Sequence, residues 1–151
     1  DATRATTYAQ TDEADVIAGR QPIRGMRGPL GFLFRLASPF MQTAPVGIDQ
    51  RVKDGDQIAA HGGIDVIASP GHTRGHVCYY WREPRVLFVG DAMTSRNKLA
   101  GSVPLFTWDM AQAKASIKRL TTLDISVLCF GHGAPITSGA REQLRQLADS
   151  L

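Results

Sequence analysis

Three segments of this chain end an apolar run with a glycine, and a side chain that can bind a metal ion follows directly. The segments are Gly71-His72, Gly90-Asp91 and Gly131-His132. Glycine allows a sharp turn without a Cβ clash, so the next side chain projects from a rigid support. Two imidazoles and one carboxylate placed in this way suit Zn²⁺, Mn²⁺ or Fe²⁺.

Short runs rich in β-branched and aromatic residues predict the strands that carry these groups. They cover residues 64–68, 76–81, 85–89 and 125–130, and a further strand is expected at 6–10. Strands whose carboxyl ends meet at one edge of a sheet bring the following side chains together. We therefore expect His72, Asp91 and His132 to converge, and a separation beyond about 10 Å would rule out a shared metal site.

Apolar residues at helical spacing predict two amphipathic helices, from Met110 to Leu120 and from Ala140 to Leu151. Asp109, with Gln112 three residues later, is a candidate N-cap of the first helix, and Ser138 is the candidate for the second. A shorter helix is expected at residues 12–18. Strands that alternate with helices predict an α/β fold.

Size and composition indicate one soluble domain over residues 1–151. The chain is 43% hydrophobic and carries a formal net charge of +3. Its basic residues are spread along the sequence, so nucleic acid is not an expected partner. No apolar run reaches the roughly 18 residues of a membrane helix. Cys78 and Cys129 lie in apolar strand-like runs and are expected to be buried, reduced thiols of a cytoplasmic protein.

Residues 20–48 fit neither a helical nor a strand period. Four prolines interrupt this stretch, which also holds an apolar segment from Phe32 to Met41 and four arginines without an acidic residue. One interpretation is a long connection whose aromatic residues pack on the core or on a second copy of the chain. The other is a lid whose apolar side covers a pocket and whose cations meet an anionic substrate.

Taken together, these motifs resemble those of the metallo-β-lactamase superfamily. In that family a Gly-His-Thr-x-Gly-His motif, a strand ending in Gly-Asp and a late Gly-His-Gly occur in this order, as they do here from Gly71 to Gly133. The resemblance is good from about residue 50 onward and looser over residues 1–20. It implies half of an αββα sandwich, with a mixed sheet and flanking helices.

The resemblance also implies a role for each residue. His72 matches a ligand of the first metal, Asp91 the catalytic carboxylate that bridges both metals, and His132 a ligand of the second. His76 and Thr73 match residues that orient the ligands from behind. The remaining histidine, His61, lies in a glycine-rich stretch and is expected to be a solvated turn residue.

The family's His-x-His-x-Asp-His motif does not occur in this sequence, and the expectation is that the chain begins just after it. The resemblance implies a metal-dependent hydrolase with two zinc ions and a small ester, thioester or lactone substrate. With its three ligands divided between two ions, this chain alone should bind zinc weakly or not at all and should be inactive.

The alternative is a non-catalytic binding or structural remnant of the same fold. An exposed sheet face favours association, so a homodimer or a separate N-terminal half is the expected partner. Light scattering that shows a monomer at low concentration would contradict the dimer. Metal analysis separates the two functions, because only the enzyme requires stoichiometric zinc.

Overall fold

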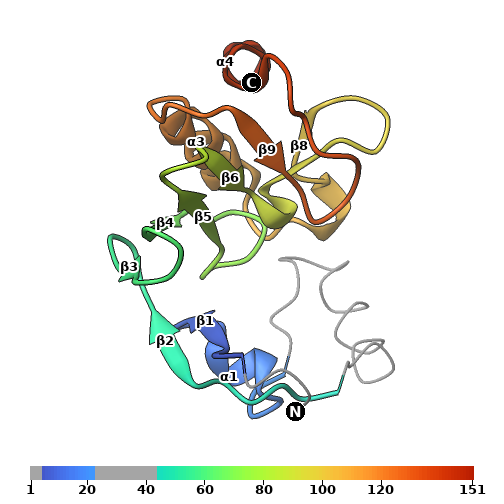
Figure 1. Cartoon of the computed structure of the whole chain (residues 1–151). Helices are drawn as coiled ribbons and strands as arrows, with labels where there is room; N and C mark the ends of the chain where they lie inside the picture. Colours follow the sequence, from blue (N-terminus) through green and yellow to red (C-terminus); the bar gives the residue numbers. More distant parts are fainter. Residues whose placement is uncertain (1–4, 23–43) are drawn as a thin grey trace.

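The structure is a computed structural model that describes residues 5–22 and 44–151 (Figure 1). Its strands are β1 (Tyr8–Gln10), β2 (Gln50–Val52), β3 (Gln57–Ile58), β4 (Ile64–Ala68), β5 (Val77–Trp81), β6 (Val86–Phe88), β7 (Met93–Thr94), β8 (Ala100–Gly101) and β9 (Val127–Cys129). Its helical elements are α1 (Ala14–Ile17), the 3₁₀ turns η2 (Gly90–Ala92) and η3 (Pro104–Phe106), α3 (Met110–Leu120) and α4 (Ala140–Asp149). Most of the predicted insertion at 20–48 lies outside the described residues.

The central sheet has five strands in the order β3-β4-β5-β6-β9. Its neighbours are antiparallel except for β6 and β9, which are parallel. A mixed sheet with helices confirms the predicted α/β class. The parallel pair needs a long crossover, and α3 lies within it, as is usual for parallel strands.

The core lies between this sheet and the two long helices. Leu87 of β6 and Leu128 of β9 are register partners, and both side chains are fully buried. They belong to one cluster with Ile117 and Leu120 of α3 and Leu144 of α4. The apolar faces predicted from helical spacing are therefore the faces that the helices bury. Burial of this kind stabilises a domain by roughly 1.5–3 kcal/mol for each large side chain.

The predicted elements agree with the structure except at their ends. The strand at 64–68 is confirmed residue for residue, and the other predicted strands are shorter by one to three residues. Asp109 caps α3 as predicted, because its carboxylate accepts hydrogen bonds from the backbone N–H groups of Ala111 and Gln112. Ser138 does not cap α4, so that prediction was wrong. Gly139 stands at the cap in a left-handed conformation, with φ of +64°, and no side chain caps the helix.

A smaller unit precedes the central sheet, where β1 pairs in parallel with β2 and α1 packs beside them (Figure 1). The helix covers four residues instead of the seven predicted. Arg51 of β2 contacts Asp15 of α1, with 2.5 Å between Nη2 and Oδ1. This ion pair ties the strand to the helix across a long stretch of sequence.

The cysteines only partly meet the expectation of burial. Both are free thiols, and Cys78 is fully buried, whereas Cys129 is half-buried. Burial raises the pKa of the Cys78 thiol to about 12. Cys78 is therefore an apolar core residue that donates a weak hydrogen bond, as expected of a structural cysteine.

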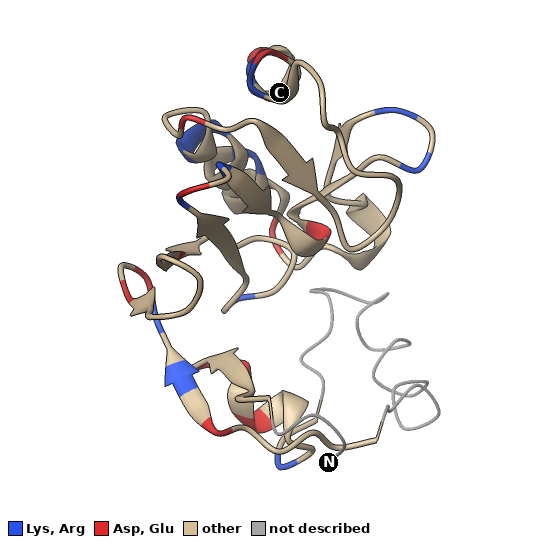
Figure 2. Cartoon of the chain, in the orientation of Figure 1, with Lys and Arg blue, Asp and Glu red and all other residues tan. Residues whose placement is uncertain are grey.

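Charged residues are distributed over the fold. Figure 2 shows Lys and Arg on β2, on α3, on α4 and on the loop after β7, with Asp and Glu among them. This agrees with the spread of charge along the sequence. The described residues contain no helix with the length and apolar character required to cross a membrane.

Asp54 anchors the end of β4, from which the loop that carries His72 departs. Its Oδ1 accepts a hydrogen bond from the backbone N–H of Ala68, at 2.7 Å, and both of its oxygens contact Nη2 of Arg119 on α3. The bond from Ala68 and then the Arg119 guanidinium hold the pKa of Asp54 below its usual range. The carboxylate thus links the strand end to the helix.

We expect Asp54→Asn to lower the free energy of unfolding by about 1 kcal/mol at neutral pH, a value already reduced for solvent exposure. Because the folded pKa is lowered, this stability is present above the unfolded pKa of about 4 and is lost as the pH falls through the folded value. The difference from the wild type, measured by urea denaturation, should therefore shrink in acid. Asp149→Asn is the control, since Asp149 makes no hydrogen bond or ion pair with the described residues; a pH-independent difference for Asp54→Asn would contradict the prediction.

Candidate metal centre

Strand direction brings the predicted site residues to one edge of the sheet. Strands β4 and β6 run the same way because each is antiparallel to β5, and β9 is parallel to β6. Their carboxyl ends therefore meet at a single edge, where His72, Asp91 and His132 follow. Strand β5 starts at this same edge, and His76 directly precedes it.

Asp91 lies between the two predicted histidine ligands. Its Oδ2 is 3.8 Å from Nε2 of His72, and its Oδ1 is 3.6 Å from Nε2 of His132. Each carboxylate oxygen thus faces a different imidazole. The predicted convergence of the three residues is confirmed, well within the 10 Å limit.

These spacings fit a carboxylate that shares one ion with each imidazole. Two ligand atoms about 2.1 Å from a zinc ion are separated by roughly 3.4 Å in a tetrahedral site, close to both distances. Both are too long for a hydrogen bond. Among residues 5–22 and 44–151, no group of three or more His, Cys, Asp or Glu side chains is placed to hold an ion. Within these residues Asp91 thus forms two separate close pairs, one with each histidine.

The loop that carries His72 is held tightly against α3. Gly71 has φ of +140°, and a Cβ at this position would collide with the backbone of Ala113 in the helix. The carbonyl of Gly71 accepts a hydrogen bond from Asp109 N–H, and the carbonyl of Thr73 accepts one from Gly71 N–H. Thr73 therefore shapes this turn through its backbone carbonyl, and its supporting role stays a prediction.

The rear nitrogen of His72 is hydrogen-bonded within the fold. Its Nδ1 is 3.1 Å from the hydroxyl of Ser102, which follows β8. Burial lowers the pKa of His72, against the smaller opposing effect of the Asp91 carboxylate. The imidazole is therefore neutral near pH 7, which is the form that binds a metal ion.

His76 lies behind the site and is mostly buried. Its Nδ1 is 2.7 Å from Oγ of Ser69, and its ring centroid is 6.0 Å from that of His72. Burial and then the neighbouring His72 lower the pKa of His76 to about 4. Its Nε2 lies near Gly90, where an added Cβ would come within 3.0 Å. These contacts place His76 against the turn before Asp91, and its supporting role stays a prediction.

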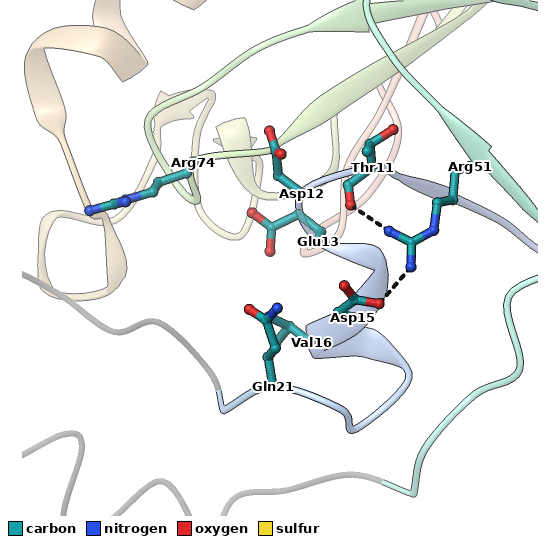
Figure 3. A pocket seen from close by; sticks show the side chains of 8 residues that line it. All are labelled: Thr11, Asp12, Glu13, Asp15, Val16, Gln21, Arg51 and Arg74. Atoms are coloured by element: carbon teal, nitrogen blue, oxygen red, sulfur yellow. Dashed lines mark hydrogen bonds and ion pairs between the residues drawn. The ribbon is translucent and has the colours of Figure 1, made fainter.

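The segment between β1 and α1 contacts the loop that joins His72 to His76. Oε1 of Glu13 accepts a hydrogen bond from Gly75 N–H at 2.7 Å. The guanidinium of Arg74 lies 4.7 Å from the ring centroid of Trp108. Arg74 borders a cavity of about 510 Å³, shown in Figure 3. Its other lining residues are Thr11, Asp12, Glu13, Asp15, Val16, Gln21 and Arg51.

Sequence reasoning missed Glu13, Ser69 and Ser102. Ser69 stands beside the recognised Pro70-Gly71-His72 run, so its position carried a signal. Ser102 contacts a histidine 30 residues earlier and follows a two-residue strand, and nothing local marks it. His61 lies outside the site, on an exposed turn with φ of +49°, as predicted.

Comparison with known proteins relates this chain to one family. A family model described as the metallo-beta-lactamase superfamily matches residues 4–132. A hydroxyacylglutathione hydrolase of Aeromonas hydrophila is 40% identical over 97 residues, which are 64% of this chain and 36% of that protein. A probable metallo-hydrolase of Bacillus subtilis is 36% identical over 98 residues, covering 56% of this chain and 37% of its own length. The chain thus spans about a third of the length of these relatives.

Solved structures share the fold. One protein, solved in a di-iron-bound form, matches with a TM-score of 0.66 and 22% identity, covering 99% of this chain and 67% of its own. At 22% identity the match shows that the two proteins share a fold, and it does not show that they share the chemistry of the site.

The close approach of Gly71 to α3 generates a prediction. Gly71→Ala should lower the free energy of unfolding by about 3 kcal/mol, because the methyl group meets helix backbone and the φ value disfavours any side chain. Gly47→Ala is the matched control, since no atom of residues 5–22 or 44–151 lies within 4 Å of the added Cβ and its φ is outside the left-handed region. Chemical denaturation checks both. Equal stabilities for the two variants would contradict the tight packing described.

Proposed function

This chain belongs to the metallo-beta-lactamase superfamily, and from that membership we propose that it forms one side of the two-metal site of a zinc-dependent hydrolase. The observation that supports the proposal is Asp91, which presents one oxygen to His72 and the other to His132. Asp91 would contribute to the binding of both ions, and His72 and His132 would each contribute to one of them. A carboxylate between two imidazoles can present an oxygen to each of two cations.

The chemistry of such a site is hydrolysis. When bound, the two ions supply Lewis acidity that lowers the pKa of a water molecule and polarises a carbonyl oxygen. The protein's part is to hold the donors in place, and the glycine turns and buried partners of His72 do so. The likeness to a hydroxyacylglutathione hydrolase supports a small thioester or ester as the substrate class. Thr73 and His76 keep the ligand-bearing turns in shape.

The chain's own donors do not complete either ion's coordination. Zinc sites in enzymes normally use three protein ligands for each ion, and each proposed ion here has two. We propose that the missing ligands come from residues outside this sequence. The isolated chain should therefore bind zinc weakly and show no turnover of its own, in keeping with its coverage of about a third of its relatives.

Zinc titration of the chain tests this proposal. We expect weak binding that Asp91→Asn reduces by about 10-fold or more, and that His72→Ala and His132→Ala each reduce as well, because every variant removes a donor. His61→Asn is the control, since it changes a histidine outside the site and keeps a residue that tolerates a positive φ. Isothermal calorimetry measures the affinities. An equal loss in the control, or no loss for Asp91→Asn, would refute the metal centre.

A second candidate function is a non-catalytic module of the same fold that associates with a partner or a second copy. Val103, Leu105 and Phe106, around η3, are 43%, 51% and 51% exposed. Three neighbouring apolar side chains at the surface favour association. The homodimer stays a prediction. A stable dimer that binds no zinc would favour this module over the hydrolase.

A further inference from the structure

Two buried hydroxyl groups stand in a row behind His72. Ser102 and Thr107 are 4% and 7% exposed, and both lie far from His72 in sequence. Oγ of Ser102 is 3.1 Å from Nδ1 of His72 and 2.7 Å from Oγ1 of Thr107. Oγ1 of Thr107 is in turn 2.7 Å from the carbonyl oxygen of Val103. The row therefore runs from an imidazole nitrogen through two hydroxyls to a carbonyl.

The carbonyl at its end fixes the direction of every hydrogen bond in the row. A carbonyl oxygen only accepts, so the single hydroxyl proton of Thr107 goes to Val103. Between the two hydroxyls, Ser102 must then be the donor, since Thr107 has no second proton to give. Because the Ser102 hydroxyl already donates its single proton to Thr107, it can only accept a hydrogen bond from His72. Nδ1 of His72 must therefore carry the proton.

The opposite arrangement leaves lone pairs facing each other. If Nδ1 lacked its proton, an imidazole lone pair would point at a Ser102 oxygen that has no proton to offer, in a site closed to water. An unsatisfied buried polar group costs enough to disfavour that tautomer by about 10-fold or more. The proton on Nε2 would gain little in return, because Oδ2 of Asp91 is 3.8 Å away, beyond hydrogen-bond distance.

We propose that Thr107 is a positioning residue that acts through Ser102 to fix the Nδ1–H tautomer of His72, which leaves the Nε2 lone pair directed to the side of Asp91. Thr107 touches neither the imidazole nor any reacting atom. Its effect on metal binding rests on the proposed function, whereas its effect on the tautomer does not. Fixing the nitrogen in advance spares the site a proton shift when an ion binds.

His76 shows why the carbonyl matters. The hydroxyl of Ser69 next to His76 is contacted by Sγ of Cys78, at 3.1 Å, but the thiol also lies 3.9 Å from the carbonyl oxygen of Val89. The thiol proton has two acceptors in reach, so this chain of contacts does not impose a direction on the Ser69 hydroxyl. Behind His72, by contrast, the Thr107 hydroxyl donates to the Val103 carbonyl, which fixes the direction of the other hydrogen bonds.

The tautomer is measured directly in the metal-free chain. Long-range ¹H–¹⁵N correlation of ¹⁵N-labelled histidine distinguishes the two ring nitrogens, at about pH 8, where a neutral imidazole is ensured. His72 should show the Nδ1–H form in about 10-fold excess or more. A predominant Nε2–H form in the wild type would overturn the proposal, and this measurement needs no variant to fold.

Variants of Thr107 test its part. Thr107→Val keeps the shape but removes the acceptor, so Ser102 becomes free to donate to Nδ1 and the Nε2–H form should rise several-fold. Thr107→Ser keeps the hydroxyl and should behave as the wild type. Thr121→Val is the matched control, because within the described part of the chain the Thr121 hydroxyl donates only to the Lys118 carbonyl at the end of α3. Equal tautomer ratios in Thr107→Val and Thr121→Val would overturn the role of Thr107.

Zinc binding separates the two proposals. If the hydrolase proposal holds, Thr107→Val should weaken zinc affinity by about 10-fold and Thr107→Ser should not. A wild-type chain that binds no zinc counts against the proposed function, while the histidine spectrum still decides the tautomer. A chain that binds zinc with His72 in the Nε2–H form in the metal-free state overturns the inference and leaves the function standing.

Discussion

The parallel pairing of β6 with β9 is the constraint on which the candidate site depends. Phe88 is the register partner of Cys129, and Asp91 and His132 each follow their partner by three residues. Backbone bonds continue the pairing past the strand ends, from Val89 N–H to the Cys129 carbonyl and from Gly131 N–H to the Gly90 carbonyl. A slip of one residue would move one side chain by about 3.3 Å along the strand and turn it to the other face. The distance between Asp91 and His132 is therefore set by backbone hydrogen bonds, and the buried Leu87–Leu128 pair holds the register.

The position of His72 does not depend on the pairing of β6 with β9. His72 follows β4, which does not pair with β6, so its position depends on the loop that starts at Ser69. That loop is fastened to α3, where Gly71 meets the helix backbone and Oγ of Ser116 donates to the carbonyl of Pro70 at 2.7 Å. The helix also packs Ile117 and Leu120 into the core. Core packing and placement of His72 are thus coupled, because a shift of α3 would carry the loop with it.

Much of this arrangement could be predicted from the sequence, because it depends on local patterns. Runs of β-branched residues located β4, and the Gly-His and Gly-Asp steps located the groups at the strand ends. Contacts between distant residues gave no such pattern. The hydroxyl of Ser102 and the carboxylate of Glu13 reach the His72–His76 loop across 30 and 62 residues. Residue type alone favours Ser138 as the cap of α4, but Gly139 occupies the cap position in a left-handed conformation. The candidate donors could be identified from local sequence motifs, whereas the residues that support them could be identified only from the fold.

The three donors differ in their exposure to water, so the site has a more buried end and a more exposed end. The side chains of His72, Asp91 and His132 are 20%, 39% and 54% exposed. The pair made by His72 and Asp91 lies deeper and has a hydrogen-bonded rear nitrogen, so its geometry is fixed before any ion arrives. The pair made by Asp91 and His132 faces solvent. The Asp91–His72 pair is therefore the more buried end of the proposed site, and His132 is its more exposed end.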